Sequence, residues 1–516
     1  MMGILSRVKA KKMGANSLLF TLFISLFLWS CTGTGKGPGG TYYVDASNGS
    51  DKYNGASPTF EGADIGPWKT VARVNKTRFS PGDSILFKRG ETWLGTPLQP
   101  KNGGEAGGVI TISDEVLSEQ IQFDLVDPEN HNCVYFGAYG KGDKPKIDCQ
   151  REKGLIISHN YIIVEDLHLD NGGNNMLLFD HSKGNYWNVV RRVEVTNCAG
   201  NAVRFSEGGG NCWLQELNVY DYKVNGIYLE GSEQHPLKGV LVEDCRVEDP
   251  EVYDKEDGIS CHRDADGNNI TGDIIIRNNT VIRSGEDGID ITSGTNILVE
   301  GNVLEHCHSG GVFVGKTWVN TVEVRGNFIN ANSISKTIGD LTIGASKVRA
   351  VNNIITGTGH HSICLNEGTD IQIWNNVIAP VNRTGHLVWL RGKGELRNVV
   401  FKNNIFDLSQ AEQMISGSLD NIIFDNNCYY APSKSRQIYS DLSFEGLRAA
   451  NSAFEPNGFW ANPRFVAKKK QTPDHFKLAG NSPCINRGEA LPLAADFWKN
   501  DRLKTGKIDV GVFEKN

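Results

Sequence analysis

The feature that most constrains the fold of this chain is a strand-like pattern that returns every 23 to 28 residues. Each copy contains a short run of alternating apolar and polar residues, an asparagine, a second apolar run and a few turn residues. The alternation excludes helical repeats, and the spacing is typical of a solenoid in which each repeat forms one turn, here called a rung. The asparagines that mark successive copies are Asn279, Asn302, Asn327, Asn353, Asn376, Asn404 and Asn427.

We therefore predict an all-β fold, a right-handed parallel β-helix whose asparagines stack and hydrogen-bond along the turns. The pattern places the β-helix at residues 140–430, an N-terminal cap with the first rungs at 41–139, and an irregular C-terminal capping segment at 431–516. Caps are expected because the apolar ends of the terminal rungs would otherwise be exposed.

The N-terminus has the pattern of an export signal. Basic residues at positions 7–12 precede the apolar run "LLFTLFISLFLW", which is too short and too early for a membrane-spanning helix. Residues 1–31 are a predicted signal peptide, and its end, "LWSC", resembles a bacterial lipoprotein signal in which Cys31 carries the lipid. The Gly-rich residues 32–40 would form a flexible tether. These features predict an exported protein, either a cell-surface or periplasmic lipoprotein or a secreted one, whose only membrane contact is the lipid anchor.

Charge and cysteine content limit the possible partners. The net charge of −7 over 516 residues gives no reason to expect nucleic acid, and an acidic ligand would need a local basic patch or a metal ion. The eleven cysteines show neither CxxC pairs nor regular spacing. We therefore expect small buried residues rather than zinc ligands or disulfides, and we expect a monomer.

Both ends of the predicted β-helix carry motifs of a known group. "TYYVDASNGSDKYNGAS" and "PWKTVARVN" near the start, and "DHFKLAGNSPCINRG" near the end, resemble segments of secreted bacterial β-helix proteins of the pectate-lyase-like superfamily that act on carbohydrates. The resemblance covers nearly the whole mature chain and implies a short amphipathic helix over the first rung. Residues 113–135 depart from the pattern of that group, and we interpret them as a surface loop or an added turn.

Equivalent positions on neighbouring rungs stack about 4.8 Å apart, so the inward apolar residues of successive strands also predict which residues form outward-facing columns. The first predicted column contains Arg204, Tyr228, Ser260, Asp290, Phe313, Thr342 and Trp389. The second contains Ser206, Glu230, His262, Thr292, Gly315, Gly344 and Arg391. Rings that pack on sugar faces and charges that hold carboxylates occur together here, which predicts a sugar-binding groove. Its predicted substrate-binding residues are Arg204, Tyr228, Phe313, Trp389 and Arg391.

Two acidic motifs, "EDGISCH" and "EDGIDIT", lie on consecutive predicted rungs. In this frame Asp257 and Asp287 occupy equivalent positions about 5 Å apart, with Glu286 beside them and Asp290 a few residues on. Such closeness is unfavourable unless a cation binds, a carboxyl holds a proton with a raised pKa, or the side chains splay into solvent. Several oxygen ligands without a nearby cysteine favour Ca²⁺ over zinc or copper.

The same motifs resemble the calcium site of secreted pectate lyases of polysaccharide lyase family nine. This resemblance implies that the protein cleaves an acidic, pectin-like polysaccharide by β-elimination. It implies four Ca²⁺ ligands: Asp257, Glu286, Asp287 and Asp290. The reaction needs a cation to draw charge from a uronate carboxylate and a base close to the reacting carbon. The lysine of that family is replaced by an apolar residue at the aligned position, and Lys316 lies at the strand's end, so Lys316 and His262 are both candidate bases.

Two other functions stay open. Inverting hydrolases of the polygalacturonase type present an Asp on one rung, an acid pair on the next and a histidine on a third, which resembles Asp257, Glu286 with Asp287, and His308. Asp287 is thus a catalytic candidate in either reaction. The Arg-x-Lys strand of that family is not evident in this chain. The third possibility is a non-catalytic solenoid that binds surface glycans and whose acids hold structural Ca²⁺.

Overall fold

The computed structural model describes residues 39–250, 257–262 and 271–515, apart from positions 332, 358, 383, 434–436, 468, 494 and 503–506. The chain divides into two units, residues 1–35 and 36–516, and all described residues belong to the second. The predicted signal peptide, Cys31 and most of the predicted tether therefore lie outside the described residues. Within the described part of the chain, no helix is both long and apolar enough to cross a membrane.

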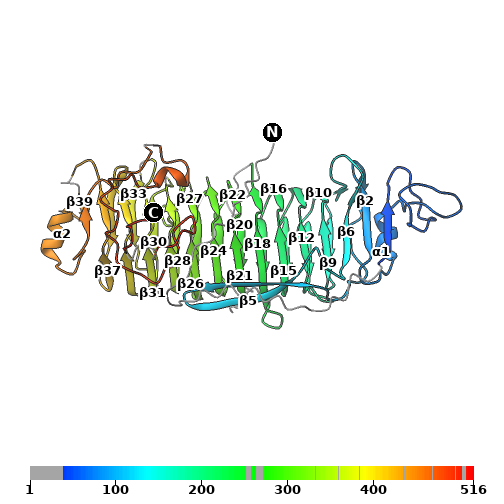
Figure 1. The fold of residues 1–516 in the computed structure, drawn as a ribbon, viewed down its shortest axis with the longest axis horizontal. Coiled ribbons are helices and arrows are strands. Elements are labelled where there is room, and N and C mark those ends of the chain that lie inside the picture. Colours follow the sequence, from blue (N-terminus) through cyan, green and yellow to red (C-terminus); the bar gives the residue numbers. More distant parts are fainter. Residues whose placement is uncertain are drawn as a thin grey trace, which may run out of the picture. The chain divides into compact units, whose positions relative to one another are not determined.

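The described chain winds into a parallel β-solenoid, and each rung contributes strands to three rows (Figure 1). Rows 1 and 3 belong to a 25-stranded sheet and row 2 is a separate 14-stranded sheet. Row 1 contains the second halves of β26 (Gly310–Arg325) and β28 (Leu341–Val351) and the strands β1 (Thr41–Val44), β2 (Ser84–Lys88), β6 (Val134–Tyr139), β9 (Ile162–Glu165), β12 (Val189–Arg191), β15 (Gly209–Gln215), β18 (Leu237–Glu243), β21 (Thr271–Arg277), β24 (Thr295–Glu300), β31 (Gly368–Trp374), β34 (Leu396–Lys402) and β37 (Ile422–Asp425).

Rows 2 and 3 complete the rungs. Row 2 contains β3 (Thr92–Leu94), β7 (Lys146–Asp148), β10 (His168–Gly172), β13 (Glu194–Cys198), β16 (Asn218–Tyr222), β19 (Arg246–Glu248), β22 (Thr280–Ile282), β25 (Val303–Glu305), β27 (Phe328–Asn330), β29 (Ile354–Ile355), β32 (Val377–Ile378), β35 (Ile405–Asp407), β38 (Cys428–Tyr430) and β41 (Phe459–Trp460). Row 3 contains the first halves of β26 and β28 and the strands β8 (Leu155–Ile157), β11 (Leu177–Asp180), β14 (Val203–Ser206), β17 (Asn225–Glu230), β20 (Asp257–His262), β23 (Asp287–Ile291), β30 (His361–Leu365), β33 (Thr384–Leu390), β36 (Ala411–Gly417) and β39 (Gln437–Tyr439). The short β40 (Leu442–Ser443) pairs with β39 in the antiparallel sense.

The seven marker asparagines form a continuous buried ladder at the turn between rows 1 and 2. Each side-chain amide donates to the side-chain oxygen of the next rung, from Asn279 to Asn302 at 3.0 Å and onward to Asn427. Asn427 in turn donates to Glu455 at 2.5 Å. The predicted asparagine stack is confirmed, and it fixes the register because a shift of one residue would remove these bonds.

The helices lie at the ends of the solenoid and in its C-terminal segment. Helix α1 (Val71–Lys76) begins after Thr70, whose hydroxyl accepts from the Arg73 amide at 3.1 Å, and it buries Val71 and Val74 against the first rungs. The amphipathic helix implied by the resemblance is therefore present. Helix α2 (Phe444–Ala450) packs its Phe444 side chain against the far end of the core, and η1 (Pro473–Phe476) follows in the C-terminal segment. Both open ends of the core are thus covered.

Residues 113–135 are not the loop or added turn that we expected. Most of them belong to an antiparallel hairpin of β4 (Val109–Val116) and β5 (Glu119–Val126), drawn in cyan across the green strands in Figure 1. The prediction was wrong because alternate residues of β5 are apolar and pack against outward apolar residues of row 1. The residues in this contact are Ile121, Phe123 and Leu125 of the hairpin and Leu241, Ile275 and Leu298 of row 1.

Polar contacts fix the tip of this hairpin. Its two turn residues, Leu117 and Ser118, have φ of 52° and 79°, as a tight two-residue turn requires. The Leu117 amide donates to Glu323 at 3.1 Å, and Arg325 donates to Asp114 at 2.7 Å. The hairpin therefore covers the outer side of row 1, while both acidic motifs lie on row 3.

The ten described cysteines are all buried and none forms a disulfide. The expectation of small buried residues is confirmed for them.

Candidate active site

The register of row 3 confirms that the predicted first column stacks. Arg204 pairs with Tyr228, Ser260 with Asp290, and Phe313 with Thr342. The alignment from sequence missed one member, because Cys364 of β30 stands between Thr342 and Trp389. The alternation of "SICL" was the signal that could have placed it.

The two acidic motifs continue a second side-chain ladder that begins with asparagines. The Asn225 side chain donates to the Asn201 side-chain oxygen at 2.9 Å, and the Asp257 amide donates to the Asn225 side-chain oxygen at 3.3 Å. The Asp287 amide then donates to Asp257 Oδ1 at 3.1 Å. Asp257 and Asp287 thus occupy equivalent positions on consecutive rungs, as predicted. Each Asp keeps the acceptor of the Asn it replaces and adds a negative charge.

On the next rung the ladder position is a glycine, which leaves room for the Asp287 side chain. Its partner on β26 is Gly310, and a Cβ there would approach Asp287 Oδ1 to 2.7 Å. Glycine is therefore required at this position, and the Asp287 carboxylate faces a space that no side chain of Gly310 fills.

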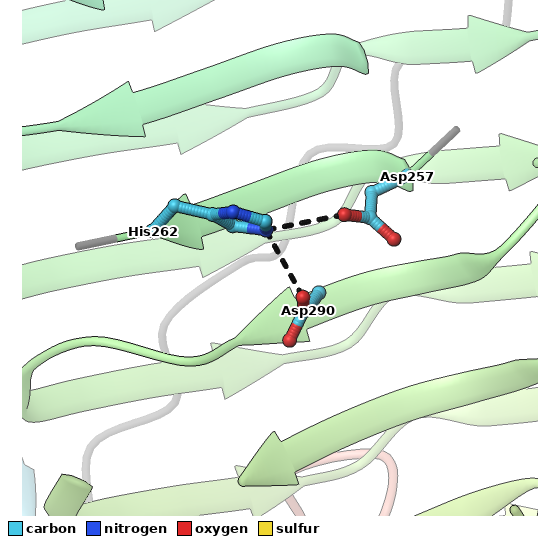
Figure 2. Close-up of side chains that lie close together, drawn as sticks. All are labelled: Asp257, His262 and Asp290. Carbon is cyan, nitrogen blue, oxygen red and sulfur yellow. Dashed lines mark hydrogen bonds and ion pairs between the residues drawn. The ribbon is translucent and has the colours of Figure 1, made fainter. Parts of the chain in front are cut away.

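His262 lies between two of the acids (Figure 2). Its Nε2 is 3.2 Å from Asp257 Oδ2 and 3.0 Å from Asp290 Oδ2. One ligand atom from each of these three residues lies within 4.8 Å of the others, so the group could hold a metal ion. We call Asp257, Asp287, Asp290 and His262 the acid cluster.

The charges in and beside the acid cluster shift the pKa values of its members. Burial and the charge of Asp257 raise the pKa of Asp287 and of Asp290 above the ordinary carboxyl value, and the charge of Glu286 adds to both shifts. Burial opposes the charged form of His262, but its hydrogen bonds to Asp257 and Asp290 outweigh this effect and raise the pKa of the ring. Glu286 is partly exposed beside the cluster.

The donor set fits the predicted Ca²⁺ site. Asp287 Oδ1 and Asp290 Oδ1 are buried and have no hydrogen-bond partner among the described residues. Buried carboxylate oxygens without a donor are unfavourable unless a proton or a cation satisfies them. Hard oxygen ligands of this kind suit Ca²⁺. The side chains that would hold it are those of the predicted set: Asp257, Glu286, Asp287 and Asp290.

Two predicted substrate-binding residues lie on the N-terminal side of the cluster. The Tyr228 ring is 5.1 Å from the His262 ring, and burial together with the charge of Glu230 raises the pKa of Tyr228 to about 12. The Arg204 guanidinium lies 5.2 Å from the Tyr228 ring centre and binds Glu230 at 2.6 Å. Arg204 is therefore already paired with an acid, while Tyr228 borders the cluster directly.

Lys316 is not beside the acids at the start of the strands. It is exposed and has a φ of 92° at the bend within β26, directly after Gly315. The register places its backbone three residues beyond the partner of Asp290, about 10 Å along the strand, and six residues beyond the partner of Asp287, about 20 Å.

The remaining predicted substrate-binding residues lie on the C-terminal side of the acid cluster. The Phe313 ring covers Gly315, since a Cβ at Gly315 would approach that ring to 2.0 Å. Trp389 and Arg391 are four rungs from Asp290 in the column, and the Arg391 guanidinium lies 5.2 Å from the Trp389 ring centre. Arg391 also donates to the Thr337 carbonyl at 3.0 Å. His308, named in the hydrolase alternative, is half-buried in the turn before β26.

Two family models match parts of the chain. Residues 153–342 match the model described as right handed beta helix region, and residues 273–430 match the one described as periplasmic copper-binding protein (NosD). No curated protein matches the chain in sequence.

Solved structures with a similar fold include enzymes that act on polysaccharides. A mannuronic acid specific polysaccharide family 6 lyase from human gut microbiota is 15% identical, with 75% of this chain and 88% of that chain covered at a TM-score of 0.50. Pectate lyase Pel9A is 15% identical, with 92% and 96% covered and a TM-score of 0.37. The GH136 lacto-N-biosidase from Eubacterium ramulus is 16% identical, with 78% and 67% covered and a TM-score of 0.41. The strand register, the match over residues 153–342 and the family 6 lyase fold together identify the chain as a right-handed parallel β-helix protein.

Proposed function

We propose that this protein is an enzyme that cleaves an acidic polysaccharide by Ca²⁺-assisted β-elimination at the acid cluster. The observation that carries the proposal is a pair of buried carboxylate oxygens, on Asp287 and Asp290, for which the described residues supply no hydrogen-bond donor and which lie beside the charge of Asp257. A bound Ca²⁺ would satisfy these oxygens and draw charge from a uronate carboxylate of the substrate.

The residues of the cluster have separate roles in this proposal. β-Elimination moves the proton α to the uronate carboxylate onto a base and breaks the bond to the glycosidic oxygen at the β carbon, which leaves an unsaturated sugar end. His262 is the proposed base because its ring contacts two of the acids, whereas the Lys316 backbone lies on the rung after Asp290 and about 10 Å along the strand from the residue that pairs with Asp290. Once the carboxylate charge is neutralised, the ring loses the interactions that raise its pKa, and its neutral form can accept a proton.

Tyr228 is proposed to contact the substrate, and Arg204 is proposed to position the Tyr228 ring. The Tyr228 ring extends the outward face beside His262, where it can pack on a sugar ring. Arg204 holds Glu230 and would keep the Tyr228 ring in place through its cation–π contact.

Asp257 and Asp290 are too close to serve as an inverting pair, whereas the pair named for the hydrolase, Asp257 with Glu286 or Asp287, is left to the experiment. Oxygens of Asp257 and Asp290 lie within 4.8 Å of each other and share His262. An inverting pair needs carboxyl groups about 6.5–9.5 Å apart so that a water molecule fits between substrate and base. The separation of the carboxyl groups does not argue against the non-catalytic alternative, which the experiment below distinguishes from the lyase.

The test is a screen of acidic polysaccharides, including pectins, alginates and sulfated algal glycans, with Ca²⁺ or with a chelator. Elimination gives ultraviolet-absorbing unsaturated ends that require Ca²⁺. Saturated reducing ends that persist with the chelator would instead establish hydrolysis. Retention of a glycan without shortening would establish binding alone.

We also propose that the protein is exported. The predicted signal peptide and the word periplasmic in the description of one matching family support this location. Cell fractionation of the full chain and of Cys31→Ser tests it: both should leave the cytoplasm, and only the unaltered chain should stay with the membrane fraction if Cys31 is lipidated.

A further inference from the structure

A loop at residues 333–340, between β27 and β28, lies over the outward side of row 3 beyond the acid cluster. Three contacts place it there. His361 Nε2 is 3.3 Å from the Lys336 carbonyl oxygen, and Arg391 donates to the Thr337 carbonyl at 3.0 Å. Cys364 Sγ is 3.9 Å from the same Thr337 carbonyl.

All three side chains reach the same part of the loop, the adjacent carbonyls of Lys336 and Thr337. His361 is the first residue of β30, Cys364 lies in its middle, and Arg391 follows the end of β33. His361 pairs with His386, which is five residues before Arg391, so the backbone positions of the three extend over about 16 Å along the strand direction. These side chains therefore converge on one stretch of the loop, which lies over the outward side of β30 around Cys364.

The residues beneath the loop are tightly packed. The Trp389 ring lies 4.3 Å from the His361 ring and 5.2 Å from the Arg391 guanidinium. His361 Nδ1 faces His386 Nδ1 at 3.2 Å. Cys364 belongs to the outward column but is completely buried, so the loop and these rings cover it.

Two rungs lie between the acid cluster and this covered region, and they present glycines and a threonine beside the Phe313 ring in the middle column of β26. On β26 and β28 the outward positions opposite the acids are Gly310 and Gly339, and farther along the strands Gly315 pairs with Gly344. Thr342 occupies the middle column of β28. Two rungs extend the substrate-binding face by about 10 Å along the solenoid axis, which is enough for about two sugar residues.

We propose that the 333–340 loop closes the substrate-binding face at β30, so that the acid cluster cleaves near a chain end and releases mainly dimers. This inference rests on the proposed function and adds the mode of attack to it. Arg391 is then a positioning residue that holds the loop, and Trp389 supports it by packing on Arg391 and His361, rather than binding distant sugars. A polysaccharide lying along the columns meets the loop two rungs beyond the acids and cannot extend farther on this side.

The first test measures whether the loop covers row 3, without any need for activity. The full chain is treated with iodoacetamide and the alkylation of each cysteine is followed by peptide mass spectrometry. Arg391→Ala removes the bond to Thr337 and should speed the alkylation of Cys364 by about tenfold. Cys261 is fully buried in the same row and should stay unreactive. Arg397→Ala is the matched control, because Arg397 is exposed and pairs with Glu395 instead.

Two results would overturn the loop assignment: rapid alkylation of Cys364 in the unaltered chain, or an unchanged rate in Arg391→Ala. If Cys261 also reacts in that variant, the whole domain has opened. In that case Arg391→Met, which keeps the packing on Trp389 but lacks the donor, is tested in place of Arg391→Ala. The alkylation of Cys364 and Cys261 is then measured in the same way.

The second test measures product length on whichever polysaccharide the screen identifies. The unaltered enzyme should release dimers from the first time points while solution viscosity falls slowly, and Arg391→Ala should add longer products. Early release of long oligomers with Cys364 still protected would overturn the inference and leave the proposed function standing. Absence of cleavage on every polysaccharide would overturn the proposed function, and with it the dimer product, while the alkylation result would still decide whether the loop covers row 3.

Discussion

The backbone amide of Asp287 donates to the carboxylate of Asp257 on the preceding rung at 3.1 Å, just as the backbone amide of Asp257 donates to the Asn225 side chain one rung earlier. One carboxylate therefore has a structural task in the ladder and a second, proposed task in the acid cluster. Its Oδ1 holds the register of row 3, and its Oδ2 contacts His262.

The first prediction follows from that double task. Asp257→Asn should keep the acceptor for the Asp287 amide and remove one charge from a crowded buried site. The variant also loses the charge of Asp257 beside the His262 ring, so the pKa of that ring, followed by NMR titration, should be lower than in the unaltered protein. Calorimetric titration should show Ca²⁺ affinity reduced by at least about tenfold, since a ligand is lost. An equal Ca²⁺ affinity in both proteins would contradict the site, and Asp420→Asn, at an exposed turn, is the control.

The second prediction concerns the asparagine ladder. Asn327 is fully buried, donates to the Val299 carbonyl at 3.0 Å and to Asn353 at 2.9 Å, and accepts from Asn302. Asn327→Ala leaves these groups without partners and should lower the free energy of unfolding by about 3 kcal/mol or more. Chemical denaturation measures this loss, for which the exposed Asn462→Ala serves as the comparison. A loss no larger than in that comparison would show that the ladder does not stabilise the solenoid.

The third prediction uses a buried acid outside the acid cluster. Asp340 is completely buried, and neither of its carboxylate oxygens has a hydrogen-bond partner among the described residues. Burial raises its pKa well above the ordinary value of 3.8. The folded state therefore holds a proton that the unfolded chain releases, so this contribution to stability is complete below about pH 4 and is lost as pH rises through the raised pKa.

Asp340→Asn should remove the loss of stability that Asp340 causes as pH rises. Thermal unfolding followed from pH 4 to pH 8 should show a smaller decline in Tm for the variant than for the unaltered protein, with the gap between them widening toward pH 8. Parallel curves would mean that Asp340 does not change its protonation on unfolding.

The fourth prediction concerns the hairpin on row 1. Phe123 is nearly buried among Leu241, Ile275 and Leu298, whereas Val109 at the start of β4 is about half exposed. Phe123→Ala should destabilise the hairpin by about 3 kcal/mol, because it leaves a cavity against an otherwise intact sheet. Hydrogen exchange should then quicken across β4 and β5 but not in β21 or β24. Val109→Ala should leave exchange unchanged, and faster exchange throughout Phe123→Ala would instead show that the hairpin and solenoid unfold together.

The sequence predicted the parts of this structure that repeat. Asn279 and its successors recur at the rung spacing, and each copy supports the interpretation of the others, so strand order, register and the outward columns followed from one period. The neighbouring positions of Asp257 and Asp287 came from the same frame. Cys364 was missed only because its strand was left out of that frame.

The features that the sequence did not predict depend on contacts between non-repeating segments. Nothing in the local pattern of β5 indicates that Phe123 packs on Ile275, about 150 residues later in the chain. Likewise, the contact between Arg391 and Thr337 requires knowledge of where a single loop crosses the rungs. The contact of His262 with the acids could not be predicted for a related reason, because the direction of its side chain depends on the burial of two acids.

The exchange of Asn for Asp along the ladder has a consequence for how such a site can arise. The two side chains have nearly the same shape, and both accept the same backbone amide, so a rung can gain a charge without any change in its backbone. Asn201 and Asn225 already occupy equivalent positions on the preceding rungs. A solenoid built in this way can shift or widen its reactive centre along its axis by single substitutions, while neighbouring rungs retain their hydrogen bonds.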